Sequence, residues 1–267
     1  MIKTFLTAIF AIISFTAAQA QQPAPRPMNE CATLAPHGFP QINLASSSAI
    51  CRHGYALLHD NRARVAAWVV YTIHAPQTLS CLPRQDAFAA DQSLPAGGRS
   101  ELNDFRRSGY DMGHIAPNGD MSWDQLVQQE SFILSNIAPQ LPGLNRGLWR
   151  ELEAAVRVWA YTSQGSLTIY AGSIYSLHDP RIGSGVIVPR AFYKIIINNQ
   201  TRETLAFLFP HRGDVGGEII HVQTTVSEIE HYTGIVFPVP DNKLIRRNIW
   251  PVNGRGLLAA RQAQCRR

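Results

Sequence analysis

The sequence predicts an α+β fold with a mainly antiparallel sheet, and three observations support this class. Apolar, β-branched runs bounded by turn residues recur along the chain, as they do in strands. One long segment instead repeats apolar residues at three- and four-residue steps, as a helix does. Strands and helices do not alternate in the strand–helix–strand units of a parallel sheet. The 267 residues contain no internal repeat or interdomain linker, so we expect one large domain.

The first residues predict a secretory signal peptide at 1–20. Lys3 precedes an apolar run at 5–15, and Ala18-Gln19-Ala20 forms a small-x-small cleavage site. The alternative is a retained membrane anchor, but the run is too short to span a bilayer, and no later stretch approaches roughly 20 uninterrupted apolar residues. We therefore expect a protein exported to the periplasm or the medium, without a membrane partner. Cleavage leaves 247 residues with a formal charge of +4.

The first half of the remaining chain predicts an arm, a hairpin and a loop. Residues 21–49 are rich in Pro, Ala and Ser and predict an irregular N-terminal arm. Strands are expected at Ile50–Leu58 and Val65–Ile73, with Asp60-Asn61 in the turn between them. Residues 75–113 carry many Pro, Gly, Asp and Arg residues, which indicates a long structured loop, and such loops are often functional.

The second half contains the clearest helix, at Asn145–Thr162. Its apolar residues, among them Leu148, Leu152 and Trp159, recur at three- and four-residue steps. The remaining patterns predict strands at Leu167–Ala171, Gly185–Val188, Ala191–Ile197 and Leu205–Phe209, and a short helix at 222–233.

The four cysteines predict two disulfides. Cys31, Cys51, Cys81 and Cys265 all come after the cleavage site, and an even count in an exported chain favours disulfides over metal ligands or nucleophiles. No C-x-x-C pair exists, which argues against a zinc site built on thiolates. Four cysteines allow three pairings, and the sequence does not choose among them. We favour Cys51 with Cys81, because they flank two predicted successive strands, and Cys31 with Cys265.

The basic residues are 21 Arg and 3 Lys. The planar guanidinium of Arg suits phosphate oxygens. A GC-rich genome produces the same bias without any function. The charge is therefore compatible with a polyanionic substrate but does not demonstrate one.

Residues 109–121, which read GYDMGHIAPNGDM, contain the first chemical motif. A single His in a loop is more often a surface or structural residue than a catalyst. A catalytic role for the motif is supported by further residues later in the chain, namely Ser135–Gln140 (SNIAPQ), Leu144-Asn145, Trp149 and Glu153.

With these residues in place, the chain resembles the DNA/RNA non-specific endonuclease family, which includes secreted bacterial nucleases and mitochondrial endonuclease G. The resemblance runs from about Ile50 to Pro251 and includes the segments 170–172, 188–194 and 230–238. It implies a single nuclease domain at 50–267 with the ββα-metal (His-Me finger) fold. In this fold, a finger of two strands and a helix carries the site on one side of a central antiparallel sheet flanked by helices.

The resemblance also implies roles for individual residues. His114 falls on the histidine of the family's Asp-Arg-Gly-His signature, the general base that deprotonates water, and a neutral imidazole suits this task. Asp111 matches the signature aspartate. Asn145 matches the single direct ligand of Mg²⁺, for which Mn²⁺ or another divalent cation substitutes, and an amide oxygen with waters suits such a hard ion. A helix N-cap is the alternative role for Asn145, and the two are compatible.

Glu153 lies eight residues after Asn145, which is about 12 Å along an unbroken helix, so both residues could not easily bind one ion directly. The resemblance implies that Glu153 instead acts through a metal-bound water. The alternative is a solvated glutamate paired with Arg157 one turn later. Arg157 and Arg84 match arginines that contact phosphate and stabilise transition-state charge. Asn136 matches an active-site asparagine that either binds substrate or supports the loop.

One position departs from the signature, because Met112 stands where the family has Arg. This removes a candidate phosphate contact, so turnover or substrate preference is expected to differ. Arg106 and Arg107 are close enough in sequence to substitute for it.

We therefore expect a metal-dependent, sugar-non-specific endonuclease that hydrolyses DNA and RNA. The sequence contains no base-reading motif, so contacts to backbone phosphates should dominate. One alternative is a non-catalytic nucleic-acid-binding protein for uptake or surface attachment, which Met112 favours and which His114, Asn145 and Glu153 oppose. Another is an exported phosphodiesterase for small nucleotides. The resemblance also implies a homodimer, without indicating its interface.

Overall fold

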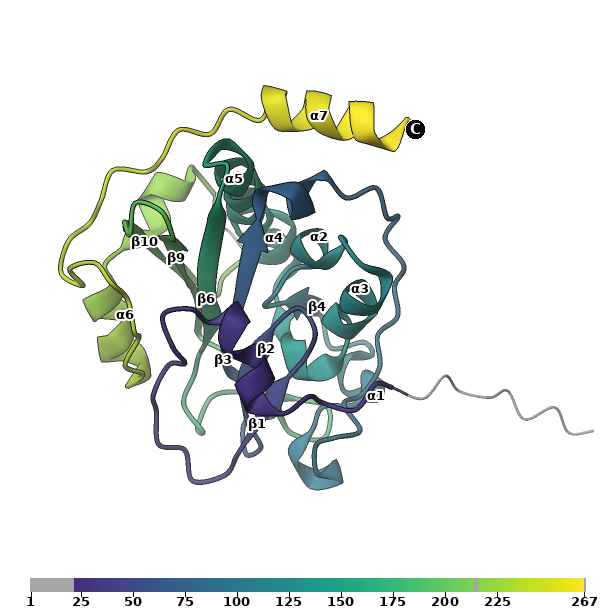
Figure 1. Ribbon diagram of the computed structural model, residues 1–267. Helices are drawn as coiled ribbons and strands as arrows, with labels where there is room; N and C mark the ends of the chain where they lie inside the picture. Colours follow the sequence, from purple (N-terminus) through teal and green to yellow (C-terminus); the bar gives the residue numbers. More distant parts are fainter. Residues whose placement is uncertain (1–21, 214–215, 267) are drawn as a thin grey trace, which may run out of the picture.

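The protein is seen in a computed structural model that describes residues 22–213 and 216–266 (Figure 1). The predicted signal peptide at 1–20 lies outside these residues. A seven-stranded sheet forms the centre, in the order β1-β2-β3-β6-β9-β10-β11, and every neighbouring pair is antiparallel. Its strands are β1 (Ser47–Cys51), β2 (Ala56–Asp60), β3 (Val65–His74), β6 (Ser166–Ile174), β9 (Ala191–Asn198), β10 (Thr204–Pro210) and β11 (Gln223–Thr224). The predicted α+β class with an antiparallel sheet is confirmed.

Two small strand pairs accompany the sheet. The strands β4 (Asp111–His114) and β5 (Ile137–Gln140) pair with each other, as do β7 (Arg181–Ile182) and β8 (Val186–Ile187). The first pair carries the candidate site and is described below.

Helices cover both faces of the sheet (Figure 1). The α-helices are α1 (Leu102–Phe105), α2 (Asn118–Met121), α3 (Gln125–Ser131), α4 (Pro142–Arg146), α5 (Leu148–Thr162), α6 (Val226–Thr233) and α7 (Arg255–Cys265). The 3₁₀ helices are η1 (Met28–Leu34), η2 (Ala75–Leu79), η3 (Ala96–Gly98), η4 (Leu134–Asn136) and η5 (Ile219–Val222). None of the helices in the described ranges has the length and apolar character needed to cross a bilayer.

Alternation along the strands supplies two apolar layers, because successive side chains of a strand point to opposite faces. On β9, Phe192 and Ile196 join the layer beneath α5, whereas Tyr193, Ile195 and Ile197 join the layer beneath α6 and η1. Lys194 shares the face of Phe192 and Ile196, yet it is fully buried. This face is the one that carries the candidate site.

The predicted elements hold, but several boundaries differ, among them the helix expected at 222–233, which begins only at Val226 after β11. The strand expected at Ile50–Leu58 is two strands, since Cys51 pairs with Ala56 across a tight connection. The helix expected at Asn145–Thr162 is interrupted at Gly147, and the strand expected at Gly185–Val188 contracts to β8. The arm at 21–49 is not wholly irregular, because it includes η1 and the first residues of β1. The sequence prediction missed α7.

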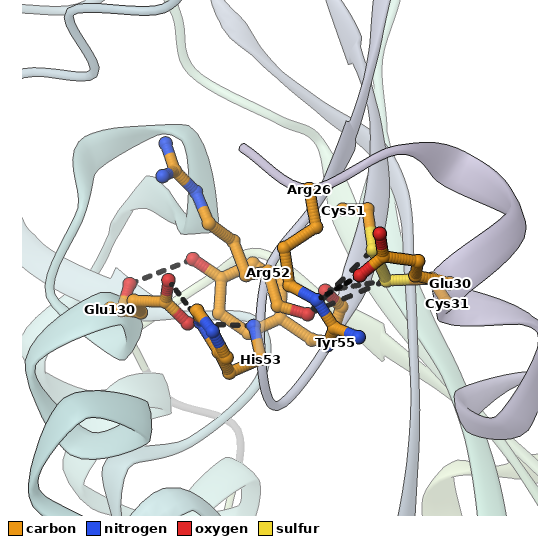
Figure 2. Close-up of a disulfide and its surroundings, with 8 residues drawn as sticks. All are labelled: Arg26, Glu30, Cys31, Cys51, Arg52, His53, Tyr55 and Glu130. Atoms are coloured by element: carbon orange, nitrogen blue, oxygen red, sulfur yellow. Dashed lines mark hydrogen bonds and ion pairs between the residues drawn. A yellow bond between two sulfur atoms is a disulfide. The ribbon is translucent and has the colours of Figure 1, made fainter. Parts of the chain in front are cut away.

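The favoured disulfide pairing was wrong. Cys31 is joined to Cys51, and Cys81 to Cys265. Cys31 and Cys51 are fully buried together in the layer beneath α6 and η1 (Figure 2). Cys81 is exposed and bonds to α7, which packs on η2 and α5 on the opposite side of the sheet. The sequence prediction paired Cys51 with Cys81 because both flank two strands, but the two cysteines lie on opposite sides of the sheet.

Candidate active site

The candidate site is built on the antiparallel pair β4–β5 and the two helices that come after β5. Asp111 pairs with Gln140 and His114 with Ile137, so the motif at 111–114 forms a whole strand rather than part of a loop. Gly113 is required for close packing, because a Cβ there would lie 2.0 Å from Oε1 of Gln140. The glycine of the motif therefore lets the Gln140 side chain lie against β4.

His114 ends β4 and is 8 % exposed. Its ring packs against Phe132, with centroids 4.9 Å apart and nearly perpendicular planes, and against Phe88 at 5.4 Å. Within the described ranges no hydrogen-bond partner reaches its buried Nε2. Aromatic packing thus orients the ring, and the backbone carbonyl of His114 accepts a hydrogen bond of 3.2 Å from Trp149 Nε1 on α5.

The surroundings of His114 favour its neutral form. Burial lowers its pKa to about 3, and the positive charges of Arg84 and Lys194 act in the same direction. The neutral imidazole that proton abstraction requires is therefore the form present at neutral pH.

Asp111, Asn145 and Arg146 form a polar cluster where β4 begins. Asn145 Nδ2 donates to Asp111 Oδ2 at 2.9 Å, and Arg146 donates to the same carboxylate from Nε at 2.8 Å and from Nη2 at 2.7 Å. Burial alone would raise the pKa of Asp111, but the bonds from Arg146 and Asn145 lower it, so the carboxylate is ionised. Asn145 therefore commits its amide nitrogen to Asp111 and keeps its carbonyl oxygen for another partner.

Gly147 separates α4 from α5 and sets the direction of Asn145. Its φ of −100° and ψ of −123° break the helix, and a Cβ there would lie 2.4 Å from the carbonyl oxygen of Gly143. Gly147, not Asn145, is the N-cap position of α5. The axial separation of about 12 Å expected for an unbroken helix between Asn145 and Glu153 therefore does not apply.

Glu153 lies on the inner face of α5 beside a buried lysine. Its carboxylate is 4.0 Å from Lys194 Nζ, and the Glu153 side chain is 13 % exposed. Lys194 Nζ donates to the carbonyl oxygen of Ile115 at 3.0 Å and lies 4.1 Å from the Trp149 ring centroid. Burial raises the pKa of Glu153 and lowers that of Lys194, while their mutual attraction opposes both shifts. Glu153 is thus not the solvated glutamate of the alternative interpretation.

Arg157 pairs with Asp120 rather than with Glu153. Its Nη1 donates to Asp120 Oδ1 at 2.8 Å, and Tyr71 donates to Oδ2 of the same carboxylate at 2.8 Å. A Cβ at Gly119 would lie 2.7 Å from that Nη1, so the guanidinium rests directly on α2. Arg157 is held firmly in the layer that contains Glu153.

The remaining predicted residues have contrasting environments. Arg84 is exposed on the loop after η2, pairs with Asp86 at 2.7 Å, and lies 5.1 Å from the centroid of Phe132, the ring that packs on His114. Asn136 is fully buried and exchanges hydrogen bonds of 2.9 Å with the backbone of Ala116 in both directions. These contacts favour a supporting role for Asn136.

Met112 packs against the core, so the departure from the family signature leaves no cation at that position. Arg146 instead brings a guanidinium to Asp111, and its side chain is 69 % exposed. Within the described residues, Arg106 and Arg107 form no side-chain hydrogen bond or ion pair with Asp111 or Asn145.

Sequence reasoning assigned no role to Lys194, Asp120 or Arg146. Lys194 did leave a signal, since it is a lone charge in the apolar strand AFYKIIIN. A charged residue in such a strand is rarely buried without a partner. Asp120 and Arg146 gave no comparable signal, because their partners are distant in sequence.

Comparison with known proteins identifies the family. The family model for DNA/RNA non-specific endonucleases matches residues 33–242. This chain belongs to that family. A nuclease of Nostoc sp. is 33 % identical over 200 residues, covering 70 % of this chain and 71 % of the relative. Bovine mitochondrial endonuclease G is 29 % identical over 221 residues, covering 76 % and 72 %.

A solved structure agrees with the family assignment. The crystal structure of an EndoG/EndoGI complex superposes with a TM-score of 0.67 at 27 % identity, covering 84 % of this chain and 96 % of that chain. The chain is therefore an endonuclease, a phosphodiester hydrolase, with the ββα-metal fold of this divalent-metal-dependent family. In this structure, β4, β5 and the helices α4 and α5 form the ββα unit.

A pH titration tests the environment of His114. In metal-free protein, the ring-proton resonances of His114 should stay at their neutral positions from pH 8 to pH 5, because burial holds its pKa near 3. The pKa of His114 in the folded protein lies below its unfolded value of about 6.5. The contribution of neutral His114 to the free energy of unfolding is therefore fully present above that value and declines as the pH falls towards 3. NMR measures this directly, and a His114 midpoint near 6.5 would contradict the description.

Proposed function

We propose that this protein is an exported, metal-dependent endonuclease that hydrolyses both DNA and RNA, with His114 as general base. The observation that carries the proposal is a buried, neutral imidazole on the β4 strand whose first residue, Asp111, is hydrogen-bonded to Asn145. Family membership supports phosphodiester hydrolysis, and the geometry supplies the residues for it.

In the proposed reaction, neutral His114 takes a proton from water as the water oxygen attacks phosphorus. The new P–O bond replaces the bond to the leaving sugar oxygen, which takes a proton from solvent while protonated His114 returns its proton to solvent, so the products are a phosphate monoester and an alcohol. Packing against Phe132 and Phe88 limits rotation of the ring, which keeps its acceptor nitrogen in place.

Asn145 and Glu153 have the chemistry to hold a divalent ion. Donation of Asn145 Nδ2 to Asp111 frees the amide oxygen for direct ligation, and the Glu153 carboxylate would act through a water molecule. Both are hard oxygen donors, which suits Mg²⁺, and Mn²⁺ or another divalent cation would substitute. When bound, the ion would neutralise charge on the scissile phosphate and the leaving oxygen.

Three arginines supply positive charge for the phosphate. We assign Arg84 and Arg157 to charge stabilisation, and Arg146 to the phosphate contact that Met112 lacks. Arg146 satisfies Asp111 through Nε and Nη2, so its Nη1 and the exposed edge of its guanidinium face solvent beside Asn145. A guanidinium fork held in this way matches phosphate oxygens.

Asp111 and Asn136 act in this proposal as positioning residues. Asp111 fixes the amide of Asn145, and Asn136 fixes the turn after His114 through the backbone of Ala116. Export, signal-peptide cleavage after Ala20 and a homodimer remain parts of the proposal, and the two disulfides fit an oxidising compartment.

Digestion of plasmid DNA and of single-stranded RNA tests the function. Wild-type protein should degrade both with Mg²⁺ and neither with excess chelator. H114A should lower the rate by about 10²–10⁴-fold, because it removes the general base. H178A, at an exposed histidine on the loop between β6 and β7, is the matched control and should retain the wild-type rate.

Persistent cleavage by purified H114A would remove His114 as the base. A wild-type protein that binds nucleic acid without cleaving it in Mg²⁺, Mn²⁺ or Ca²⁺ would instead favour the non-catalytic binding protein.

A second substitution tests Arg146. R146Q should lower kcat/KM for plasmid DNA by roughly tenfold or more, as expected for loss of a charge-assisted hydrogen bond to phosphate. Adding M112R to R146Q should recover part of the rate, whereas R106Q/R107Q should change it less than R146Q does. Steady-state rates for the four proteins settle the point, and an R146Q rate within twofold of wild type would refute the assignment.

A further inference from the structure

The last part of the chain has an unusual charge pattern. After Asp241 the sequence contains no acidic residue, but seven basic ones: Lys243, Arg246, Arg247, Arg255, Arg261, Arg266 and Arg267. The family match ends at residue 242, so this basic segment lies outside the part of the chain that the family model covers. Family membership therefore does not account for it.

The helix α7, which lies in this segment, contributes little to the core. Leu257 is its one buried residue, and Leu258 is 60 % exposed. The helix contacts η2 and α5 and runs outside the body of the fold, above α5 (Figure 1). Burial of apolar surface therefore contributes little to holding α7 in its position.

Two contacts hold α7 against the loop that carries Arg84. Cys265 is bonded to Cys81, and Arg261 Nη2 donates to the carbonyl oxygen of Ser80 at 3.1 Å. Arg84 comes three residues after Cys81 and lies over the Phe132 ring that packs on His114. The helix is thereby fixed next to the approach to the candidate active site.

Among the described residues, no carboxylate pairs with the cations at the end of the chain, from residue 255 onward. Arg255 and Arg261 of α7 and its C-cap residue Arg266 are exposed, and within residues 22–213 and 216–266 none of them forms an ion pair with a carboxylate. Elsewhere in the same ranges, exposed arginines such as Arg190 and Arg146 pair with Asp179 and Asp111. The guanidinium of Arg255, and the nitrogens of Arg261 that do not bond to Ser80, are consequently available to a polyanion.

We propose that α7 is a strap that binds the phosphate backbone of a polynucleotide and extends the substrate surface beyond Arg84. The inference rests on the proposed nuclease function and adds to it a second contact region. An 11-residue helix is roughly 16 Å long, which equals about five backbone steps of 3.4 Å. Its arginines contact phosphates without reading bases, which suits a nuclease without sequence preference.

Binding measured in the H114A background tests the strap without cleavage. The affinity for a 30-base-pair duplex and for single-stranded RNA is measured by fluorescence anisotropy over a range of KCl concentrations. Because each phosphate contact contributes about −0.9 to the slope of log K against log salt for duplex DNA, R255Q/R261Q should make that slope less negative by roughly 2. The duplex affinity at low salt should fall about tenfold.

The matched control is R62Q/R64Q, which removes the same charge at the turn between β2 and β3. This turn lies at the opposite end of β3 from η2, roughly 30 Å away for a ten-residue strand. The control should keep the slope of the H114A parent.

The outcomes separate the two proposals. An unchanged slope and affinity in R255Q/R261Q, with normal binding by the parent, would overturn the strap and leave the nuclease proposal intact. Equal losses in the control would show a general charge effect and would also overturn it. Loss of binding to anionic lipid vesicles but not to nucleic acid would assign α7 to a membrane surface instead. Failure of the parent to bind any nucleic acid would refute both proposals.

Discussion

The hydrogen bond from Asn145 to Asp111 is the contact on which the candidate site depends. It joins the last turn of α4 to the first residue of β4, the strand that ends at His114. The helix break at Gly147 places Asn145 in α4, which contacts β4, rather than in α5. Since the amide nitrogen is committed to Asp111, the amide oxygen has a defined direction. Asn145 and Asp111, separated by 34 positions in the sequence, are thereby brought into one unit.

Burial of ionisable groups beneath α5 gives the site its chemistry. His114 is neutral because its ring is buried against two phenylalanines, and Lys194 adds positive charge nearby while also donating to the carbonyl of Ile115. Glu153 and Lys194 lie in the same layer, where each offsets the cost of burying the other. Arg157 is matched by Asp120 in the same way. The inner layer is thus close to charge balance, whereas the exposed cations Arg84 and Arg146 lie at its edge, where the proposed function places the phosphate of the substrate.

The sequence predicted the sheet, the long helix and the family, because each is carried by local patterns. Alternation identified β3 and β9, and spacing from His114 to Glu153 identified the family. The sequence prediction failed where the outcome depends on how residues distant in the sequence are placed in three dimensions. The pairing of Cys51 with Cys31 depends on which side of the sheet each cysteine occupies. The break at Gly147 depends on contact with the Gly143 carbonyl, and α7 escaped notice because its sequence, RGLLAARQAQC, has little apolar periodicity. Arg146 was overlooked in favour of Arg106 and Arg107, which are nearer to Met112 in sequence but not bonded to Asp111.

Anomalous diffraction from crystals soaked in Mn²⁺ tests the central claim most directly. We expect one strong manganese peak at coordinating distance from the Asn145 side-chain oxygen, with no second protein ligand and with Glu153 separated from the ion by a water. In D111A crystals that peak should weaken or vanish, because the amide loses its orienting partner. Manganese bound only at surface carboxylates, with none at Asn145 in the wild-type protein, would contradict this view of the site.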